Sequence, residues 1–415
     1  MVVETGSMGR RWVAEDAARD FEVMGLIGTG HAFSHFVLLT LPPLFPLLKA
    51  ELGLSYFQLG SILTMASLAS GVTQLAFGFL VDRFGAVPIL LAGLAFQGLA
   101  IFGVGLAPAY GVMLALALMI GLGNATYHPA DYAILAARVS EKRVGRAFAL
   151  HNFTGYVGWS LAPVVMAFLA GHLGWHAALM IAGSAGLSIG LLLYTQRRRL
   201  DDAAGRAERL ARRSAGGSVG SGFTVLLSLP VLLCFCYFML TAIALGGLNS
   251  FAISAFTTLY GMPIEMASST VTLFFVGSAG GVLTGGWLAD KTRRHDLVAI
   301  CGLSASAAFI LLLTQDLAVW GAMAAMALAG FCNGVVTPSR DMLVKAAAPA
   351  GQTGKVFGMV STGLDIAGMV TPLIFGTLMD HDLPRFVFVA SAVATLLAGA
   401  TALTTRRARM QESAA

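Results

Sequence analysis

The chain has 415 residues, of which 57% are hydrophobic and only 11% are charged, and its mean hydropathy is +0.79. A soluble chain carries about a quarter charged residues, so this composition excludes the soluble enzyme classes and indicates an integral membrane protein. The net charge of +5 does not indicate a nucleic-acid partner, because the basic residues fall in loops on one side of the predicted membrane segments.

Twelve segments are long and apolar enough to cross a bilayer, which takes about 20 residues each. Residues 1–21 mix both charge signs and precede the first segment without a cleavage site, so they are predicted to be a cytoplasmic tail and not a signal peptide. The predicted segments are 22–48, 56–81, 87–106, 110–137, 146–171, 175–195, 223–256, 263–289, 297–315, 317–344, 355–379 and 385–405.

A charged run at 196–222 ends in Gly and Ser, which is the composition of a linker between two halves. Placing the N-terminus in the cytoplasm leaves all but three of the 26 Lys and Arg residues on that side. Both termini and the linker are therefore expected in the cytoplasm, with the chain in a bacterial inner membrane. The predicted parts are the tail 1–21, a six-helix bundle 22–195, the linker 196–222, a second six-helix bundle 223–405 and a tail 406–415.

The two halves repeat each other. The stretch GFLVDRFG at 78–85 matches GWLADKTR at 286–293, and further matches follow in order at almost the same offset. Such ordered matches indicate duplication, and halves that begin on the same side of the membrane form parallel repeats. The pairs, 208 or 209 residues apart, are Asp82 with Asp290, Asn124 with Asn333, Pro129 with Pro338, Gly145 with Gly354, Phe148 with Phe357 and Pro163 with Pro372.

With this all-α, twelve-helix duplication, the sequence resembles the major facilitator superfamily over essentially its whole length. The GxxxDRxG pattern after the second helix is similar to the signature loop of that superfamily, although Ala86, Val87 and Pro88 replace its usual closing basic pair. The resemblance implies that both copies of this loop govern the switch between conformations. Their residues are Gly78, Asp82, Arg83 and Gly85 in the first copy and Gly286, Asp290 and Lys291 in the second.

More narrowly, the stretch GHAFSHFVLLTLPPLFPLLKAELGLSYFQLGSI at 30–62 and the YHPAD stretch at 127–131 resemble fosmidomycin-resistance-like efflux proteins. This resemblance implies export of a small compound. The chain departs from that family at two places. His35 stands where the family tends to have an acidic residue, and the acidic residue after its His-Pro is replaced by Ala130, with Asp131 one place on.

Ionisable residues within the predicted helices gather in the first, fourth, fifth, tenth and eleventh. A charge in hydrocarbon costs several kcal/mol, roughly 2.5 to more than 10, so these side chains are expected to face a wet cavity or a partner. Counting at 1.5 Å per residue places His31, His128 and Asp365 near the membrane midplane. The full set is His31, His35, His128, Asp131, His151, Arg340, Asp341 and Asp365.

Proton coupling is predicted for Asp365, His31, His35 and His128. Imidazole exchanges protons near neutral pH, and burial of an unpaired carboxyl favours its protonated form. The alternatives are helix-helix hydrogen bonds for each histidine and a permanent pairing of Asp365 with Arg340 or a helix end. No metal is expected, because two histidines without a clustered carboxylate are weak grounds for a metal site.

Asp131 and Arg340 occupy equivalent positions, 209 residues apart, and carry opposite charge. One hypothesis makes them a cytoplasmic gate that closes when the carrier opens outward. The alternative is that Arg340 holds the anionic group of a substrate, as its planar guanidinium suits, and a fixed pair with Asp341 is a third reading. Side chains that could complete a substrate cavity, or else serve in packing, are Tyr127, His151, Asn152, Tyr156 and Trp159.

No ATP-binding, kinase or nucleophile motif is present, so the protein is expected not to be an enzyme, to need no cofactor, and to draw its energy from a gradient. The sequence favours a monomeric secondary transporter that exports a small amphipathic or anionic compound in exchange for protons. Its expected partners are that compound, protons and the lipid bilayer. Two alternatives stay open: an organic-anion symporter or uniporter with Arg340 as the clamp, and a non-transporting membrane receptor on the same fold.

Overall fold

The computed structural model describes residues 5–106, 109–203, 205, 207, 227–348 and 353–412, and within those ranges the chain is helical and without strands. The first half contains α1 (Thr5–Leu38), η1 (Pro42–Leu44), α2 (Phe45–Leu52), α3 (Tyr56–Phe84), α4 (Ala86–Leu106), α5 (Tyr110–Arg138), α6 (Val144–Thr195) and α7 (Arg197–Leu200). The second contains α10 (Leu229–Tyr260), α11 (Ile264–Lys291), α12 (His295–Leu312), α13 (Val319–Ala347), α14 (Thr353–Asp380) and α15 (Arg385–Glu412).

The twelve predicted crossings are confirmed. Eleven helices in the described part of the chain are long and apolar enough to span a membrane, and one of them, α6, supplies two crossings. Gly174 interrupts α6 with a φ of +82°, a conformation that glycine adopts without steric cost and that separates the predicted segments 146–171 and 175–195. The first segment is also broken, since the prolines at 42 and 43 form the 3₁₀ turn η1 between α1 and α2.

The predicted tails and linker are partly helical. Helix α1 already begins at Thr5 and α15 continues to Glu412, so both run beyond the predicted membrane segments. The start of the linker packs on the first half, where the Arg138 Nε–H donates to the carbonyl of Arg199 and the amide of Ala86 donates to Asp202. Residues 1–4, 204, 206, 208–222 and 413–415 of these predicted parts, and the side chain of Phe357, lie outside the described residues.

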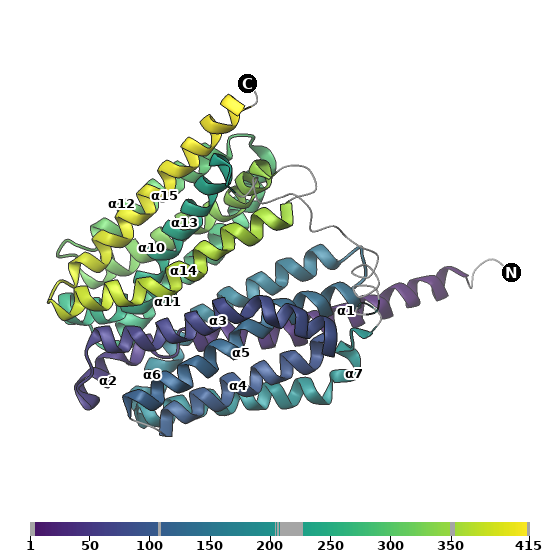
Figure 1. Ribbon diagram of the computed structural model, residues 1–415, viewed down its shortest axis with the longest axis horizontal. Coiled ribbons are helices and arrows are strands. Elements are labelled where there is room, and N and C mark those ends of the chain that lie inside the picture. The colour runs from purple at the N-terminus through teal and green to yellow at the C-terminus, as the bar shows by residue number, and fades with distance from the viewer. Residues whose placement is uncertain are drawn as a thin grey trace.

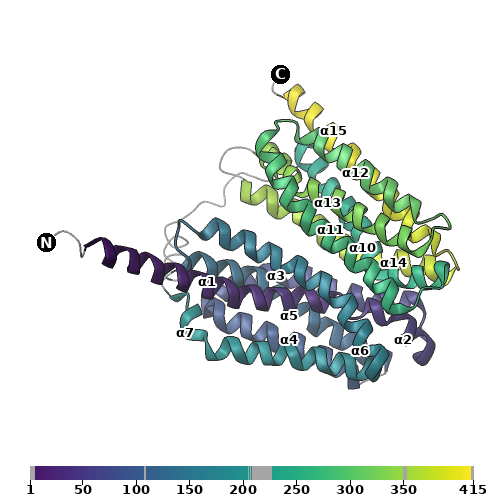
Figure 2. The same cartoon turned by 180° about the vertical axis from the view of Figure 1, so that it is seen from behind.

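The helices form two bundles, one from each half of the chain (Figure 1). The two views show the bundles meeting near α2 and diverging toward the end that carries both chain termini (Figure 2). Within the first bundle, α3 packs on α5, α4 packs on α5 and α6, and α1 packs on α6. The second bundle repeats this plan, with α11 on α13, α12 on α13 and α15, and α10 on α14 and α15.

The closest backbone approach is also duplicated. In the first half, a Cβ added to Gly121 would lie 2.9 Å from the carbonyl carbon of Ala66, and in the second half a Cβ on Gly330 would lie 2.7 Å from that of Phe274. Gly121 and Gly330 are 209 residues apart, and Ala66 and Phe274 are 208 apart. The same helix pair therefore touches through the same glycine in both halves, as the repeat predicts.

The bundles touch along two helix pairs, α3 with α14 and α6 with α11. We call the end where α3 begins at Tyr56 and α14 finishes at Asp380 the closed end, and the end where α3 finishes at Phe84 the open end. At the closed end, Asp380 accepts hydrogen bonds of 2.8 Å from the backbone amides of Tyr56 and Phe57. Further along, the Thr64 hydroxyl donates to the carbonyl of Met369, also at 2.8 Å. Contacts between the bundles thus gather toward the closed end.

Candidate functional site

Asp365 lies at a contact between α3 and α14 that is further from the closed end than the bond between Thr64 and Met369. It packs on Gly71 of α3, where an added Cβ would lie 3.1 Å from the Cβ of Asp365. The side chain is partly buried, and no hydrogen bond or ion pair joins it to another described residue. The predicted alternative of a pair with Arg340 is therefore absent in this conformation, because Arg340 bonds elsewhere. Asp365 is an unpaired carboxyl at the junction of two bundles.

The second helix pair, α6 with α11, is also joined by a hydrogen bond. The Thr272 hydroxyl of α11 donates to the carbonyl of Ser160 in α6, at 2.8 Å. One residue earlier in α6, the ring of Trp159 lies 5.7 Å from that of Phe275 in α11. Trp159 thus contacts the opposite bundle. Tyr156 packs edge-on against Trp159 with ring centroids 5.7 Å apart. These two aromatic residues, predicted for a substrate cavity, lie beside the junction.

Four histidines and one carboxylate meet inside the first bundle. His31 and His35 come from α1, His128 and Asp131 from α5, and His151 from α6. The Nε2 atom of His151 lies 3.0 Å from Asp131 Oδ2, and the Nδ1 atom of His31 lies 3.4 Å from the same oxygen. The rings of His31 and His151 stack with centroids 3.5 Å apart. We call this group, His31, His35, His128, Asp131 and His151, the histidine cluster.

The histidine cluster extends to the junction of the bundles. His35 packs edge-on against Trp159 with ring centroids 4.4 Å apart, and its ring lies 4.5 Å from that of His31. His35 and His128 are only partly buried, while His31, Asp131 and His151 are buried. The close fit of α1 on α6 follows from Gly155 and Gly158, which have no side chain to hold the two helices apart at the His35 ring.

In this structure Asp131 lies in the histidine cluster and not beside Arg340. Its carboxylate bonds within its own bundle to His151 and approaches His31. The gate hypothesis has Asp131 and Arg340 meet only when the carrier opens outward, so it stays a prediction. Arg340 instead donates from Nε to Asp341 Oδ1 at 2.9 Å, and its guanidinium lies 4.6 Å from the ring centroid of Phe238. Neighbouring residues leave a helix in different directions, yet the long arginine side chain bends back far enough to reach its neighbour.

Of the other predicted cavity residues, Tyr127 is buried within the first bundle and Asn152 is exposed. The signature-loop residues lie at the open end, where α3 and α11 finish. Gly85 has a φ of +97°, which explains glycine at this position. Arg83 lies over the ring of Phe84 and Lys291 lies over that of Trp287. The switching role of Gly78, Asp82, Gly286 and Asp290 stays a prediction.

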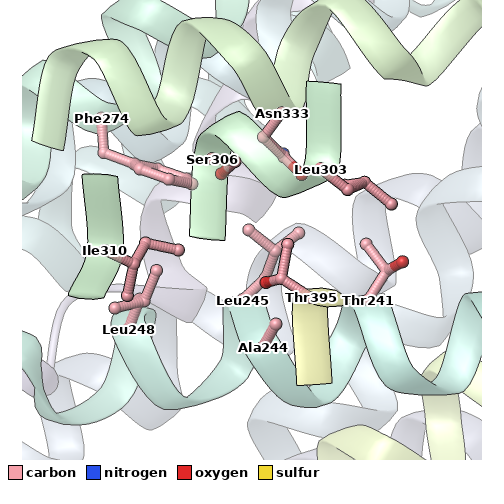
Figure 3. Close-up of a pocket in the computed structure, with 10 residues that line it drawn as sticks. All are labelled: Thr241, Ala244, Leu245, Leu248, Phe274, Leu303, Ser306, Ile310, Asn333 and Thr395. Carbon is pink, nitrogen blue, oxygen red and sulfur yellow. The ribbon is translucent and has the colours of Figure 1, made fainter. Parts of the chain in front are cut away.

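Two hollows were not predicted from the sequence. One, of about 580 Å³, is a mostly apolar groove between α1 and the two arms of α6, with Thr29 and Thr154 among its few polar side chains. The other, of about 10 Å³, lies inside the second bundle between α10, α12, α13 and α15, and Figure 3 shows Ser306, Asn333, Thr241 and Thr395 around it. It has room for about one water molecule. No sequence motif predicts either hollow, because both arise from packing between helices that are distant in the sequence.

The sequence model of the Major Facilitator Superfamily matches residues 27–267 and 239–414. The chain belongs to this superfamily. It is accordingly a multi-pass membrane transporter of a small molecule and not an enzyme. Among solved structures it is similar to a bacterial homolog of the human lysosomal transporter Spinster in an inward-facing and unoccupied conformation, with a TM-score of 0.78, 14% identity, and coverage of 95% of this chain and 98% of that one.

Sequence relatives of this transporter have mixed functions. It is 26% identical to an uncharacterized MFS-type transporter, YfnC, of Bacillus subtilis, over 85% of this chain and 89% of the relative. It is 23% identical to the fosmidomycin resistance protein of Escherichia coli, over 92% of each chain, which confirms the family resemblance found in the sequence. It is also 28% identical to the membrane sensor protein UhpC of Escherichia coli, over 64% of this chain and 63% of that protein.

Proposed function

We propose that this protein is a proton-coupled secondary transporter that exports a small amphipathic or anionic compound by alternating access, with Asp365 as the coupling group. The proposal rests on the position of Asp365, an unpaired carboxyl that packs against Gly71 where α3 and α14 join the two bundles. The similarity to a fosmidomycin resistance protein supports export. We further propose that the transporter acts as a monomer in the bacterial inner membrane with its open end in the cytoplasm.

Changes in the hydration of Asp365 would couple proton binding to the conformational change. When the bundles rock, the surfaces on one side of Asp365 separate and admit water, while those on the other side close. A carboxyl in contact with water ionises readily, whereas closing apolar surface over it favours the neutral, protonated form. Gly71 allows α3 to approach the carboxyl closely, so the closing helix replaces water directly. Each conformational cycle then takes up a proton on one side and releases it on the other.

The histidines predicted for proton coupling belong to a different part of the molecule. His31, His35 and His128 lie in the first bundle, and Asp365 lies in the second. Proton carriage by these three residues stays a prediction, and the proposal does not depend on it. Asp365 alone makes the test sharp, because one carboxyl can be replaced by an amide of nearly the same shape.

The test uses purified protein in liposomes that contain a pH-sensitive dye. Fosmidomycin, other drugs and organic acids are added in turn under an imposed proton gradient, and substrate-dependent proton movement is recorded. We expect a compound to drive proton movement in the wild type and not in Asp365→Asn. The matched control is Asp316→Asn, since Asp316 is an exposed carboxylate paired with Arg385 away from the junction. Substrate flux without proton movement would overturn the coupling, and no flux with any compound would favour a non-transporting sensor.

A second candidate is an organic-anion symporter or uniporter with Arg340 as the clamp. The bond to Asp341 occupies Nε of Arg340, and a guanidinium carries four further N–H donors in a fork that fits carboxylate. The guanidinium also makes a cation–π contact with the ring of Phe238, which restrains the side chain. Arg340 is thus a positioned cation in the second bundle.

Replacing Arg340 by Lys separates the two candidates. Lysine keeps the positive charge and loses the bidentate fork, so a clamp should lose anion affinity by about tenfold or more, in the range of about 1–3 kcal/mol for charged hydrogen bonds. Affinity is measured from the concentration dependence of transport in liposomes. Unchanged affinity with altered turnover would reject the clamp and support a part in conformational switching.

A further inference from the structure

The histidine cluster contains more buried polar atoms than its hydrogen bonds satisfy. The Nδ1 atoms of His31, His35, His128 and His151 have no hydrogen-bond partner among the described residues, and neither has Oδ1 of Asp131. Nearby, the hydroxyl of Tyr127 is buried and unpartnered as well. Leaving a buried polar group unpaired costs about 1–3 kcal/mol, so six such atoms in one place indicate that something else binds there.

Three of the histidines can converge on one point. One ring nitrogen from each of His31, His128 and His151 lies within 4.8 Å of the other two. A tetrahedral zinc ion with Zn–N bonds of about 2.0–2.1 Å holds its ligand atoms about 3.3 Å apart, so the nitrogens must approach one another by up to about 1.5 Å. The stacked rings of His31 and His151 must also turn for both to face one ion. The three ligands come from α5, α6 and α1, and a bound ion would therefore join three helices of the first bundle.

Asp131 prepares His151 for such a role. A neutral imidazole carries one N–H and one lone pair, and the contact of Nε2 with the carboxylate places the N–H on that side. The lone pair then lies on Nδ1, which is the buried atom without a partner. A carboxylate that orients a ligand histidine in this way is a common feature of metal sites, where it fixes the ring and adds negative charge near the cation.

We propose that His31, His128 and His151 bind a divalent transition-metal cation, with Asp131 as the orienting carboxylate. Imidazole nitrogen suits zinc, cobalt, nickel and copper, whereas magnesium and calcium prefer oxygen ligands. The objection raised by the sequence, that no carboxylate accompanies the histidines, is removed by the position of Asp131. An ion would enter past His128, because its ring is only partly buried and the Tyr132 ring stacked on it is exposed.

The metal site goes beyond the proposed transport function and does not rest on it. Transport is carried by Asp365 in the second bundle, while the metal would bind inside the first. The two proposals therefore fail separately. Metal binding without substrate-driven proton movement would reject the transport mechanism alone, and proton movement in a protein that binds no metal would reject the site alone.

The test measures Co²⁺ and Zn²⁺ binding to the full-length protein in detergent, after removal of any polyhistidine tag. We expect one ion per chain by equilibrium dialysis, and visible absorption typical of four-coordinate Co²⁺. X-ray absorption of the Zn²⁺-loaded wild type should show the scattering of imidazole rings and needs no variant. A monodisperse protein that takes up no ion, or a zinc shell made of sulfur or of oxygen alone, would overturn the proposal.

Variants then assign the ligands. We expect His128→Ala and His151→Ala to lose the Co²⁺ spectrum, and Asp131→Asn to weaken binding by about 10–100-fold, as loss of an orienting partner does. His172→Ala is the matched control, because His172 is exposed and bonds only to the carbonyl of Phe168 in its own helix. Binding that survives in both His128→Ala and His151→Ala would show that the ion lies elsewhere and would reject the site.

Discussion

The two bundles share their packing and differ in their chemistry. Gly121 and Gly330 occupy equivalent positions, and each lets the same pair of helices touch backbone to backbone. Ten residues further along the same two helices the halves differ, since Asp131 in the first corresponds to Arg340 in the second. Asp131 is buried among imidazoles, whereas Arg340 pairs with its own neighbour and is partly exposed.

The same divergence appears at other equivalent positions, 209 residues apart. His151 of the histidine cluster corresponds to Val360, and His128 corresponds to Thr337. In the opposite direction, the carboxyl of Asp365 corresponds to the phenol of Tyr156. At Gly121 and Gly330 both halves thus keep a residue without a side chain where two backbones meet, because a side chain there would separate the helices. Residues near the junction of the bundles were free to specialise, and each half acquired its own ionisable group.

The first prediction compares the same position in the two bundles. Asp131→Ala should destabilise the protein more than Arg340→Ala, since it leaves the buried ring of His151 without its hydrogen-bond partner, at about 1–3 kcal/mol, and removes the carboxylate that lies 3.4 Å from His31. The pair of Arg340 with Asp341 is about half exposed on its acidic side, and such pairs contribute about 1 kcal/mol or less. The apparent melting temperature in detergent is the measurement. Equal decreases in the melting temperature of the two variants would show that Asp131 and Arg340 contribute equally to stability.

The second prediction concerns the shared packing. Gly121→Ala and Gly330→Ala should each cost about 1–3 kcal/mol, because the added methyl group meets the backbone of the facing helix. The two losses should be similar, and Gly78→Ala, where nothing lies within 4 Å of an added Cβ, should be close to neutral. Thermal unfolding of the three variants in one detergent tests this. A large difference between the first two would contradict the equivalence of the repeats.

The third prediction addresses the closed end. Asp380 accepts from two amides at the first turn of α3 and lies 3.6 Å from Lys49, so Asp380→Asn removes a charge that a helix N-terminus stabilises by about 1 kcal/mol or less. The closed end should open more often. Spin labels at Glu51→Cys and His381→Cys, with the native cysteines replaced, report the distance. The neighbouring Asp382→Asn should leave the distance distribution unchanged, and the same shift in both variants would reject the role of Asp380.

Much of the architecture could be predicted from the sequence. Hydrophobic length gave most helix ends to within a few residues, apart from the extensions of α1 to Thr5 and of α15 to Glu412. The repeat related the helices of the two halves to one another, because it depends on matches along the chain. Counting residues placed His31 and His128 at one membrane depth, together with Asp365, and did not place Asp131 beside them. Depth does not fix the direction in which a side chain points, and that direction brings Asp131 to His151 in this conformation.

The contacts between the bundles were not predicted at all. Thr64, Thr272 and Asp380 are common residue types in ordinary helix positions, and they become informative only when α14 or α6 is placed beside them. The apolar groove beside α1 could not be predicted for the same reason. A sequence pattern records the periodicity of one helix, while these features depend on the register between two helices from different halves.

The hydrogen bonds that cross between the bundles bear on the energy needed to work the carrier. Thr64 and Thr272 each donate to a carbonyl of the opposite bundle, and water can take over both partners when the surfaces separate. Together with the two bonds that Asp380 accepts from Tyr56 and Phe57, these amount to about 2–6 kcal/mol net. One proton that crosses a potential of about 100 mV releases about 2.3 kcal/mol. The cost of breaking these bonds at the closed end is therefore comparable to the energy that about one to three ions release on moving down their gradient, without the hydrolysis of a nucleotide.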